Sequence, residues 1–205
     1  MLALNYREGD ALMSTKENML DISQGFITFN QVRESGVPYS VIRKKLDSGE
    51  LEKDERGIYR KPDTYVDELY TLQYRYPKGV YSLETALWLH GLSLTVPFEP
   101  VMSFPYGTNT KLIKEAGIKP IILRSHYDEG IVKVKTPGGQ MVRVYDVERT
   151  LTESLRGVYK MDVQIIAPAF KMYAAQGRIN FSKLFKYAKL FKVEKKVQSY
   201  LEVLE

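Results

Sequence analysis

Residues 26–61 read FITFNQVRESGVPYSVIRKKLDSGELEKDERGIYRK, and this stretch decides the fold of the first part of the chain. Asn30 can cap a short helix, because its side chain can accept the free N–H groups of a first helical turn. Gly36 ends that helix, since glycine tolerates the positive φ that such a stop requires. Pro38 suits the start of a second helix that runs to about Ser48, where a missing N–H does no harm. The stretch therefore predicts two helices separated by a tight turn.

The predicted second helix has an apolar side and a polar side. Ile42 and Leu46 are four residues apart and share one face. The opposite face carries Ser40, Arg43, Lys44 and Asp47. Two short extended runs follow at 51–53 and 58–61, joined by the turn sequence DERG at 54–57. Two helices and a charged hairpin in this order predict a winged helix-turn-helix, which lays its second helix in the DNA major groove and its hairpin against the backbone.

The residues predicted to contact DNA lie on this second helix and in the hairpin. They are Tyr39, Ser40, Arg43 and Lys44 on the helix, and Lys53, Arg56 and Arg60 in the hairpin. We expect the hairpin to contact mainly phosphates, because Asp54 and Glu55 make its turn too acidic to enter a groove comfortably. An ordinary helical hairpin with solvated lysines is the alternative. The short turn with its glycine, the basic run 43–45 and the adjoining hairpin together favour DNA binding.

The composition of the whole chain limits its class. With 205 residues, 44% of them hydrophobic, it can form one large or two modest domains. The absence of cysteine excludes disulfides and thiol chemistry. The first twenty residues include acids and no long apolar run, so we expect no signal peptide, and no segment approaches the roughly 20 apolar residues of a membrane span. These features predict a cytoplasmic protein without a membrane partner.

The formal net charge of +5 is unevenly distributed along the chain. Residues 1–62 and residues 63–150 each contain ten basic and ten acidic side chains. Residues 151–205 contain ten basic and five acidic side chains, so the whole excess lies there. A positive net charge favours an anionic partner. The basic character of the N-terminal stretch is therefore local, on the second helix and in the hairpin.

The rest of the chain predicts a second domain of the α+β class. The turn-like residues 61–64 suggest a boundary, so we expect a winged helix-turn-helix domain at 1–62 and an α+β domain at 63–205. A first helix from about Ser14 to Gly25 would pack behind the helix pair. Later helices are predicted at 65–76, after the cap Ser82, and at 147–158, 162–176, 180–191 and 193–204, with strands at 101–104, 121–124, 131–135 and 141–145. The sheet is expected to be small and mostly antiparallel, with helices before and after it.

No residue pattern indicates catalysis, a metal or a cofactor. The two histidines, His90 and His126, lie in different segments, and neither has metal-ligand spacing. We interpret His90 as a helix C-terminal residue that interacts with free carbonyl groups. The sequence therefore predicts a protein that is not an enzyme.

Three carboxylates between residues 146 and 153 are the nearest approach to an acidic site. Asp146, Glu148 and Glu153 could form a cluster, but Arg149 and Arg156 are available to pair with them. We therefore expect a structural network of ion pairs at these positions.

A basic series after Gly177 is the strongest signal outside residues 26–61. Its members are Arg178, Lys183, Lys186, Lys189, Lys192, Lys195 and Lys196, interrupted by the single acid Glu194. A spacing of three places successive lysines on a slowly drifting helical stripe. The positions between them hold Phe181, Leu184, Phe185, Ala188 and Phe191, which are expected to face the core. The series could be a solvated surface, a set of DNA phosphate contacts or a docking surface for an acidic partner.

Four segments together resemble the AbiEi antitoxins of the AbiE abortive-infection, type IV toxin–antitoxin systems. They are residues 26–61, VYSLETALWLHGL at 80–92, VRVYDVERTLTESLR at 142–156 and AAQGRINFSKLFKYAK at 174–189. The segment DVERTL at 146–151 is the most specific of them. Glu153 stands where the family pattern leads us to expect an aspartate, so a carboxylate is kept.

This resemblance implies a phage-defence protein with two roles. Members of the family repress transcription of their own operon and neutralise a nucleotidyltransferase-like toxin. The implied partners are double-stranded DNA of the protein's own promoter, expected to contain inverted repeats, and the cognate toxin. A winged-helix regulator whose α+β domain senses a small ligand is the main alternative. A nuclease with a DNA-targeting module is a third, which the lack of a convincing acidic or histidine site disfavours.

Overall fold

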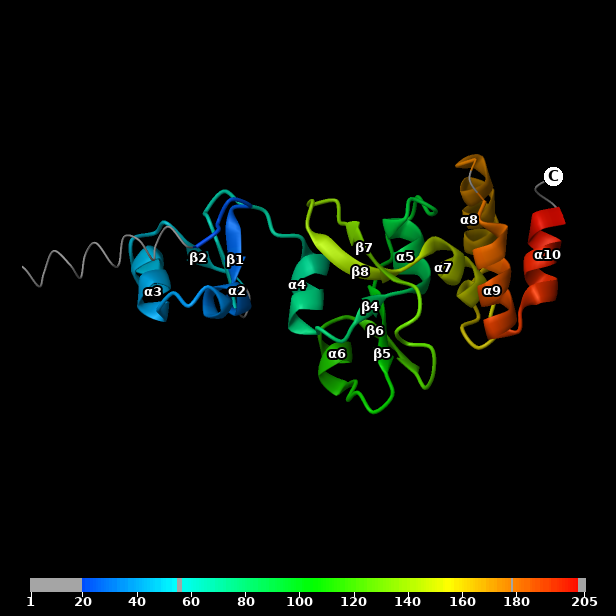
Figure 1. Cartoon of the computed structure of the whole chain (residues 1–205), viewed down its shortest axis with the longest axis horizontal. Coiled ribbons are helices and arrows are strands. Elements are labelled where there is room, and N and C mark those ends of the chain that lie inside the picture. The colour runs from blue at the N-terminus through cyan, green and yellow to red at the C-terminus, as the bar shows by residue number, and fades with distance from the viewer. Residues whose placement is uncertain (1–19, 55–56, 178, 203–205) are drawn as a thin grey trace, which may run out of the picture. The chain divides into compact units, whose positions relative to one another are not determined.

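The computed structural model describes residues 20–54, 57–177 and 179–202. The chain divides into two compact units, the first ending at Thr71 and the second beginning at Leu72. The division falls within helix α4 (Glu68–Arg75), further along the chain than the predicted boundary at residue 62 (Figure 1). Within the described part of the chain, no helix is both long enough and apolar enough to cross a membrane.

The first unit contains the two helices and the hairpin that residues 26–61 predict. Its elements are β1 (Phe26–Thr28), α2 (Phe29–Glu34), α3 (Tyr39–Asp47), β2 (Glu52–Lys53) and β3 (Ile58–Arg60). The three strands form one sheet in the order β1-β3-β2, and both strand pairs are antiparallel. The hairpin strand β3 is therefore the centre of this sheet.

Helix α2 begins earlier than predicted, because a different residue caps it. The Oγ1 of Thr28 accepts a hydrogen bond from the backbone N–H of Gln31 at 3.3 Å, and the backbone N–H of Thr28 donates to Oε1 of Gln31 at 2.8 Å. This reciprocal capping box satisfies two N–H groups at once, so the prediction that Asn30 is the cap is wrong. Helix α3 follows Pro38 as predicted, and Gly36 in the turn has a φ of 69°.

The core of the first unit lies between the two helices and the sheet. Its buried members are Leu20, Ile27, Val32, Val37, Val41, Ile42, Leu51 and Tyr59. Ile42 is fully buried and Leu46 is partly buried, so the apolar face predicted for α3 is confirmed. The predicted helix from Ser14 falls mainly outside the described residues, and residues 20–25 form no helix.

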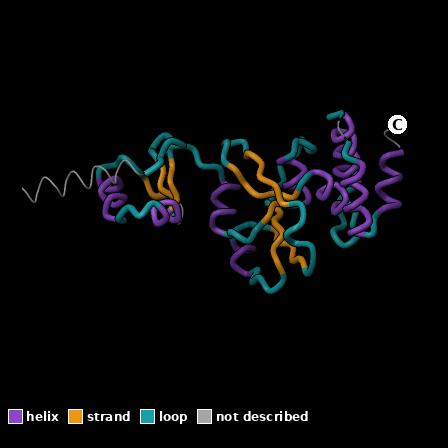
Figure 2. The backbone as a smooth tube through the Cα atoms, in the orientation of Figure 1, coloured by secondary structure: helices purple, strands orange, loops and turns teal. Residues whose placement is uncertain are grey.

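The second unit combines a five-stranded sheet with helices, as the α+β prediction requires. Its strands are β4 (Val80–Tyr81), β5 (Val101–Pro105), β6 (Lys119–Leu123), β7 (Ile131–Lys135) and β8 (Met141–Tyr145). Its helices after α4 are α5 (Leu83–Leu89), α6 (Lys111–Glu115), α7 (Val147–Ser154), α8 (Val163–Ala175), α9 (Phe181–Phe191) and α10 (Glu194–Glu202). Figure 2 shows these strands with helices on either side of them.

The sheet of the second unit is mixed, so the expectation of a mostly antiparallel sheet is wrong. The strand order is β6-β5-β4-β8-β7. Strands β5 and β6 pair in parallel, as do β4 and β8, whereas β4 with β5 and β7 with β8 are antiparallel. The sequence pattern missed β4, a strand of two residues that inserts between β5 and β8. Helix α6 connects β5 to its parallel neighbour β6, and β8 pairs in parallel with β4 only after β5, β6 and β7 have been added, so each parallel pair is joined by a crossover and not by a hairpin.

The helices of the second unit enclose a separate apolar core. It contains Leu87, Leu92, Leu151, Leu155, Ile166, Ala169, Phe170, Tyr173, Leu184, Ala188, Val193 and Val197. These residues come from α5 and its C-terminal turn, α7, α8, α9 and α10, and in Figure 1 the last three helices gather at the C-terminal end of the chain. Helix α7 is the central element of this core, because every residue from Arg149 to Ser154 is buried.

Candidate functional site

The exposed side of α3 presents the residues predicted to contact DNA. Ser40, Arg43 and Lys44 are exposed on this helix, opposite the buried Ile42. Lys45 is less exposed than its two basic neighbours. Its side chain is 17% exposed, and its Nζ lies 2.6 Å from Oε1 of Glu50. The basic run 43–45 therefore places two of its three cations on the polar face of the helix.

An aromatic cluster fixes the start of α3. The ring of Tyr39, 48% exposed, lies 6.4 Å from the ring of Phe29 and 6.3 Å from that of Tyr59. Tyr59 is buried on β3 and Phe29 is 43% exposed at the start of α2. Tyr39 thus joins the two helices to the hairpin at the edge of the candidate DNA surface. Phe29 was missed by sequence reasoning, although an aromatic residue directly after a cap is a visible signal.

Arg60, one of the residues predicted to contact DNA, forms ion pairs within the hairpin. Arg60 lies directly opposite Glu52 in the strand pairing, and its Nη2 is 2.9 Å from Oε2 of that residue. Its Nε is also 3.4 Å from Oδ2 of Asp54. Lys53 is exposed, and Arg56 lies outside the described residues. Of the described hairpin cations, Lys53 is therefore better placed than Arg60 for phosphate contact.

The basic series on α9 is not uniform. The Nζ of Lys183 lies 3.2 Å from Oδ2 of Asp146 and 3.1 Å from Oε2 of Glu148. Burial opposes the charge of Lys183, but the bond to Glu148 and the two negative charges outweigh it, so the pKa of Lys183 is raised. By contrast, Lys186, Lys189 and Lys192 are exposed, and Arg178 lies outside the described residues. Lys183 therefore belongs to an internal network.

Two of the aromatic residues expected to face the core are on the surface. Phe181 is 53% exposed and Phe185 is 40% exposed, whereas Leu184 and Ala188 are fully buried. The buried positions of α9 are Leu184, Tyr187 and Ala188, and their spacing defines the narrow face that packs against neighbouring helices. Phe181 and Phe185 fall outside this face. The exposed side of α9 is consequently both aromatic and basic.

The carboxylate of Asp146 organises the start of α7. Its Oδ1 accepts from the backbone N–H of Arg149 at 2.9 Å, so Asp146 caps the helix. Its Oδ2 accepts from the hydroxyl of Tyr187 at 2.9 Å. Gly130 approaches so closely that a Cβ there would lie 2.5 Å from both Oδ2 of Asp146 and the Tyr187 hydroxyl. The cap is thus enclosed by α9 and by the loop before β7.

Arg149 is a fully buried cation within α7. Its Nε lies 3.3 Å from Oε2 of Glu153, and its Nη1 donates to the backbone carbonyls of His126, at 2.5 Å, and Glu129. The Cζ atom lies 3.4 Å from the centre of the Tyr145 ring. Among the described residues, no acceptor contacts Nη2 of Arg149. The guanidinium therefore joins α7 to the loop between β6 and β7 and retains one unused nitrogen.

The remaining carboxylates of α7 are also paired. Oε1 of Glu153 accepts from the Tyr159 hydroxyl at 3.0 Å and lies 3.6 Å from Nη1 of Arg156. Oε1 of Glu148 accepts from the Tyr173 hydroxyl at 2.8 Å. With the bonds of Asp146 and Arg149, these contacts confirm the predicted ion-pair network. In the part of the chain that is described, no group of three His, Cys, Asp or Glu side chains could hold a metal ion.

His90 ends α5, as predicted, but its side chain contacts a strand. Its Nε2 lies 2.7 Å from the carbonyl oxygen of Tyr145 on β8. Since a carbonyl can only accept, this nitrogen must carry the hydrogen. Burial lowers the pKa of His90, although the bond to Tyr145 opposes the shift. His90 therefore stands at the helix end as predicted, but its ring contacts a strand carbonyl in place of the helix carbonyls that were expected, and it links α5 to the sheet.

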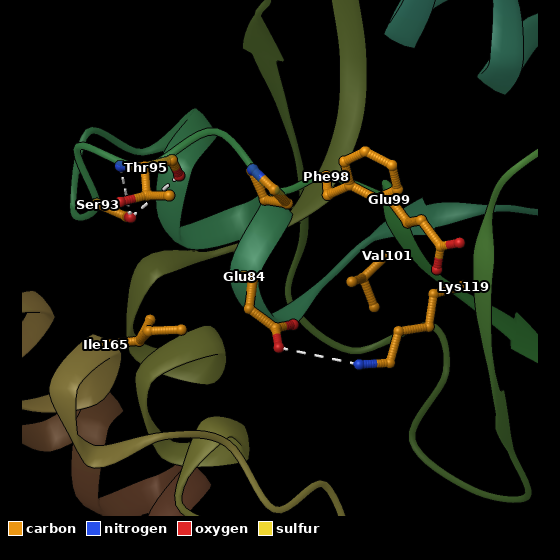
Figure 3. A pocket seen from close by; sticks show the side chains of 9 residues that line it. Glu84, Ser93, Thr95, Phe98, Glu99, Val101, Lys119 and Ile165 are labelled. Carbon is orange, nitrogen blue, oxygen red and sulfur yellow. Dashed lines mark hydrogen bonds and ion pairs between the residues drawn. The ribbon is translucent and has the colours of Figure 1, made fainter.

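A surface loop of the second unit exposes three large apolar side chains beside a cavity. Leu94 is 91% exposed, Val96 is 61% exposed and Phe98 is 100% exposed. The adjoining cavity of about 260 Å³ is shown in Figure 3. It is lined by Glu84, Ser93, Thr95, Pro97, Phe98, Glu99, Val101, Lys119 and Ile165. The sequence showed this segment only as one interrupted by prolines, so it did not indicate exposed apolar residues.

Comparison with known proteins gives a likeness to solved structures at low sequence identity. Neither the protein-family models nor the curated proteins give a match to this chain. Among solved structures, the chain is similar to the RV2827C protein from Mycobacterium tuberculosis, with a TM-score of 0.49 and 12% sequence identity. The similarity covers 80% of this chain but 66% of that protein, just under two thirds of its length.

Proposed function

We propose that this protein binds double-stranded DNA through a winged helix-turn-helix in its first unit and represses its own operon. The observation that carries the proposal is the polar face of α3, where Ser40, Arg43 and Lys44 are exposed beside a paired hairpin. The order of elements supports it, because two helices joined by a short turn and followed by an antiparallel hairpin are what a winged helix-turn-helix requires.

The side chains on α3 fit a division of roles in DNA recognition. The guanidinium of Arg43 can donate two parallel hydrogen bonds to a guanine edge, and the hydroxyl of Ser40 can bond to several bases. Lys44 and Lys53 supply point charges that suit phosphates. Tyr39, held by its neighbouring rings, can position the helix start against the backbone. We therefore assign base reading to Arg43 and backbone contact to the lysines.

Equilibrium DNA binding to the upstream promoter tests this assignment. Replacing Arg43 by Ala should weaken binding by about 1–3 kcal/mol and relax the sequence preference. Replacing Lys44 by Ala should weaken binding to all sequences alike. Lys45→Ala is a matched control, since this lysine lies on the same helix but its side chain is only 17% exposed. The proposal fails if Arg43→Ala and Lys44→Ala combined leave promoter binding intact.

We further propose that the second unit neutralises a nucleotidyltransferase-like toxin. Its exposed apolar loop supports a protein partner, because clustered apolar side chains such as Leu94, Val96 and Phe98 are a common feature of protein interfaces. Co-expression with the neighbouring gene product tests the idea. The full chain should restore growth, and the variant with Leu94, Val96 and Phe98 changed to Ser should not. Loss of rescue must occur without loss of promoter binding.

A ligand-sensing regulator is the second candidate function. It is favoured by a charged cavity in the second unit, which Arg124, His126 and Arg156 help to line. A neighbouring reading frame that encodes a nucleotidyltransferase would support the antitoxin function. If cells that express the neighbouring gene grow equally well with and without this chain, the sensor function is supported.

A further inference from the structure

A second cavity, of about 360 Å³, lies where the end of β6 approaches the C-terminal ends of α7 and α9. Its walls combine apolar and charged side chains. Ile121, Ile122, Leu123, Val158, Leu190 and Phe191 form the apolar part, and Arg124, Ser125, His126, Glu153, Arg156 and Tyr159 form the polar part. A cavity of this size is in the range that holds small organic ligands.

Positive groups outnumber negative ones around this cavity. Arg124, His126 and Arg156 are basic, and Glu153 is the acidic side chain among the lining residues. Glu153 already accepts from Tyr159 and contacts both Arg149 and Arg156. Glu129, which contacts His126, is a second carboxylate beside the cavity. Three guanidinium groups, those of Arg124, Arg149 and Arg156, still outnumber the two carboxylates, so an excess of positive charge remains.

The buried guanidinium of Arg149 adds a donor that has no acceptor. Its Nη2 is buried, and none of the described residues supplies a partner for it. Nε and Nη2 share one edge of a guanidinium, and the carboxylate that Nε contacts, Glu153, lines the cavity. This edge of Arg149 therefore lies against one residue of the cavity wall, Glu153. Buried donors without acceptors are uncommon. Arg149 is not one of the lining residues, so this donor lies behind the wall of the cavity and adds positive charge there.

His126 is held at the cavity in a conformation that non-glycine residues seldom adopt. Its φ is 60°, in the left-handed region. Its backbone carbonyl accepts from Nη1 of Arg149 at 2.5 Å, and its Nδ1 lies 2.6 Å from Oε1 of Glu129. These contacts stabilise the strained residue and leave Nε2 of its ring available. Such strain is often found where a side chain must be positioned for a ligand.

We propose that this cavity binds a small organic phosphate. The phosphate would contact Arg124, Arg156 and His126, because guanidinium groups match phosphate oxygens in geometry and charge. The apolar walls, including Val158 and Phe191, would hold the organic part. Arg149 does not line the cavity, and it positions Glu153 and the backbone of His126 through its hydrogen bonds. This assignment does not depend on DNA binding, since no residue of the first unit takes part.

Calorimetric titration of the full chain tests the proposal with three probes: inorganic phosphate, adenosine monophosphate and succinate. We expect the monophosphate to bind at least tenfold more tightly than inorganic phosphate, since it also contacts the apolar walls. Binding should be weakest for succinate, which lacks a phosphate. Succinate binding as tightly as the monophosphate would overturn the assignment to phosphate, and failure of all three to bind at millimolar concentration would overturn the site.

Two variants locate the site. Each of the changes Arg124→Gln and Arg156→Gln should weaken monophosphate binding at least fivefold. The side chain of Arg124 is exposed, so its change should not affect folding. Lys114→Gln, an exposed change on α6 away from the lining residues, is the matched control and should leave the affinity within twofold. Equal affinity in the parent and in Arg124→Gln, with unfolding temperatures unchanged, would contradict the proposal. Promoter binding should be unaffected by Arg124→Gln, which separates this test from that of the proposed function.

Discussion

Helices α3 and α7 have nine and eight residues, and each carries several charged side chains, but the two helices place these charges in opposite environments. In α3 only Val41 and Ile42 are buried, and Arg43, Lys44 and Asp47 are exposed. In α7 everything from Arg149 to Ser154 is buried, and the charges are paired. The difference shows that most charges of a helix face solvent where one side of the helix is covered, and that they pair with one another where all sides are covered.

Removing Arg149, the buried cation of α7, is expected to have the largest effect and tests the comparison most directly. Arg149→Met should lower the free energy of unfolding by about 3–5 kcal/mol, because it leaves the 2% exposed carboxylate of Glu153 without its nearest buried partner. Arg43→Met on α3 is the matched control and should change stability by about 0.5 kcal/mol or less. Urea unfolding of the two variants measures both values. Equal losses would mean that the two helices do not differ in the way proposed.

Close packing around the cap of α7 gives the second prediction. Gly130→Ala should destabilise by about 2–4 kcal/mol, since the residue has a φ of 71° and its Cβ would press against Asp146 and Tyr187. Gly139→Ala is a matched control, because its φ is 86° but a Cβ there would meet nothing within 4 Å. That change should cost only the left-handed strain of about 1–2 kcal/mol. Thermal unfolding that ranks the two variants equally would contradict the packing argument.

A third prediction separates Lys183 from the rest of its series. Burial works against the charged form of Glu148, but its backbone hydrogen bond and its bonds to Tyr173 and Lys183 outweigh burial, so the pKa of Glu148 is lowered. A lowered carboxyl pKa stabilises the fold above the ordinary value of 4.5, and this contribution disappears as pH falls through the folded-state pKa. Lys183→Met should therefore reduce stability at neutral pH and flatten its decline on acidification.

The expected loss for Lys183→Met is about 1 kcal/mol or less at pH 7, since its side chain is 37% exposed and water screens the pair. Lys186→Met, on the same helix but exposed, should leave both the stability and its pH profile unchanged. Unfolding curves measured between pH 3 and pH 7 give the comparison. Parallel profiles for the parent and Lys183→Met would show that the pair contributes nothing.

The sequence predicted those features that depend on local spacing. The alternation at 131–135 and 141–145 gave both strands of the β7–β8 hairpin, and the spacing of Ile42 and Leu46 gave the covered side of α3. Arg149 and Glu153 are four apart on one helix, so their pairing followed from helix geometry alone. Prediction was best where the interacting groups are near in sequence.

The features that were missed depend on which segments meet in space. Lys183 pairs with Asp146 at the start of another helix, and no spacing rule connects them. Strand β4 has only two residues, too few to show an alternating pattern. Periodicity places Phe181 and Phe185 beside the buried face of α9, but it cannot tell how wide a face the neighbouring helices cover. The cavity beside Arg149 likewise arises only when three separate segments come together.

The last prediction concerns exposed members of the basic series. Their replacement is expected to have the smallest effect on stability, but it distinguishes between the possible binding partners. Changing Lys186, Lys189 and Lys192 together to Ala should alter stability little, because all three are exposed. If they bind DNA phosphates, the slope of log affinity against log salt should fall by about one unit for each phosphate that is no longer neutralised. If they dock an acidic toxin, promoter binding should be unchanged and association with the toxin slower.

Lys183 is left unchanged in this triple variant, so the α7 network stays intact and any effect belongs to the surface. Salt-dependent promoter binding and growth rescue are the two measurements that distinguish the alternatives. We favour phosphate binding, because the exposed face of α9 joins these cations to Phe181 and Phe185 without a compensating acid on that helix. If the triple variant binds the promoter with the parental salt slope and also restores growth as well as the parent does, these lysines form only a solvated surface.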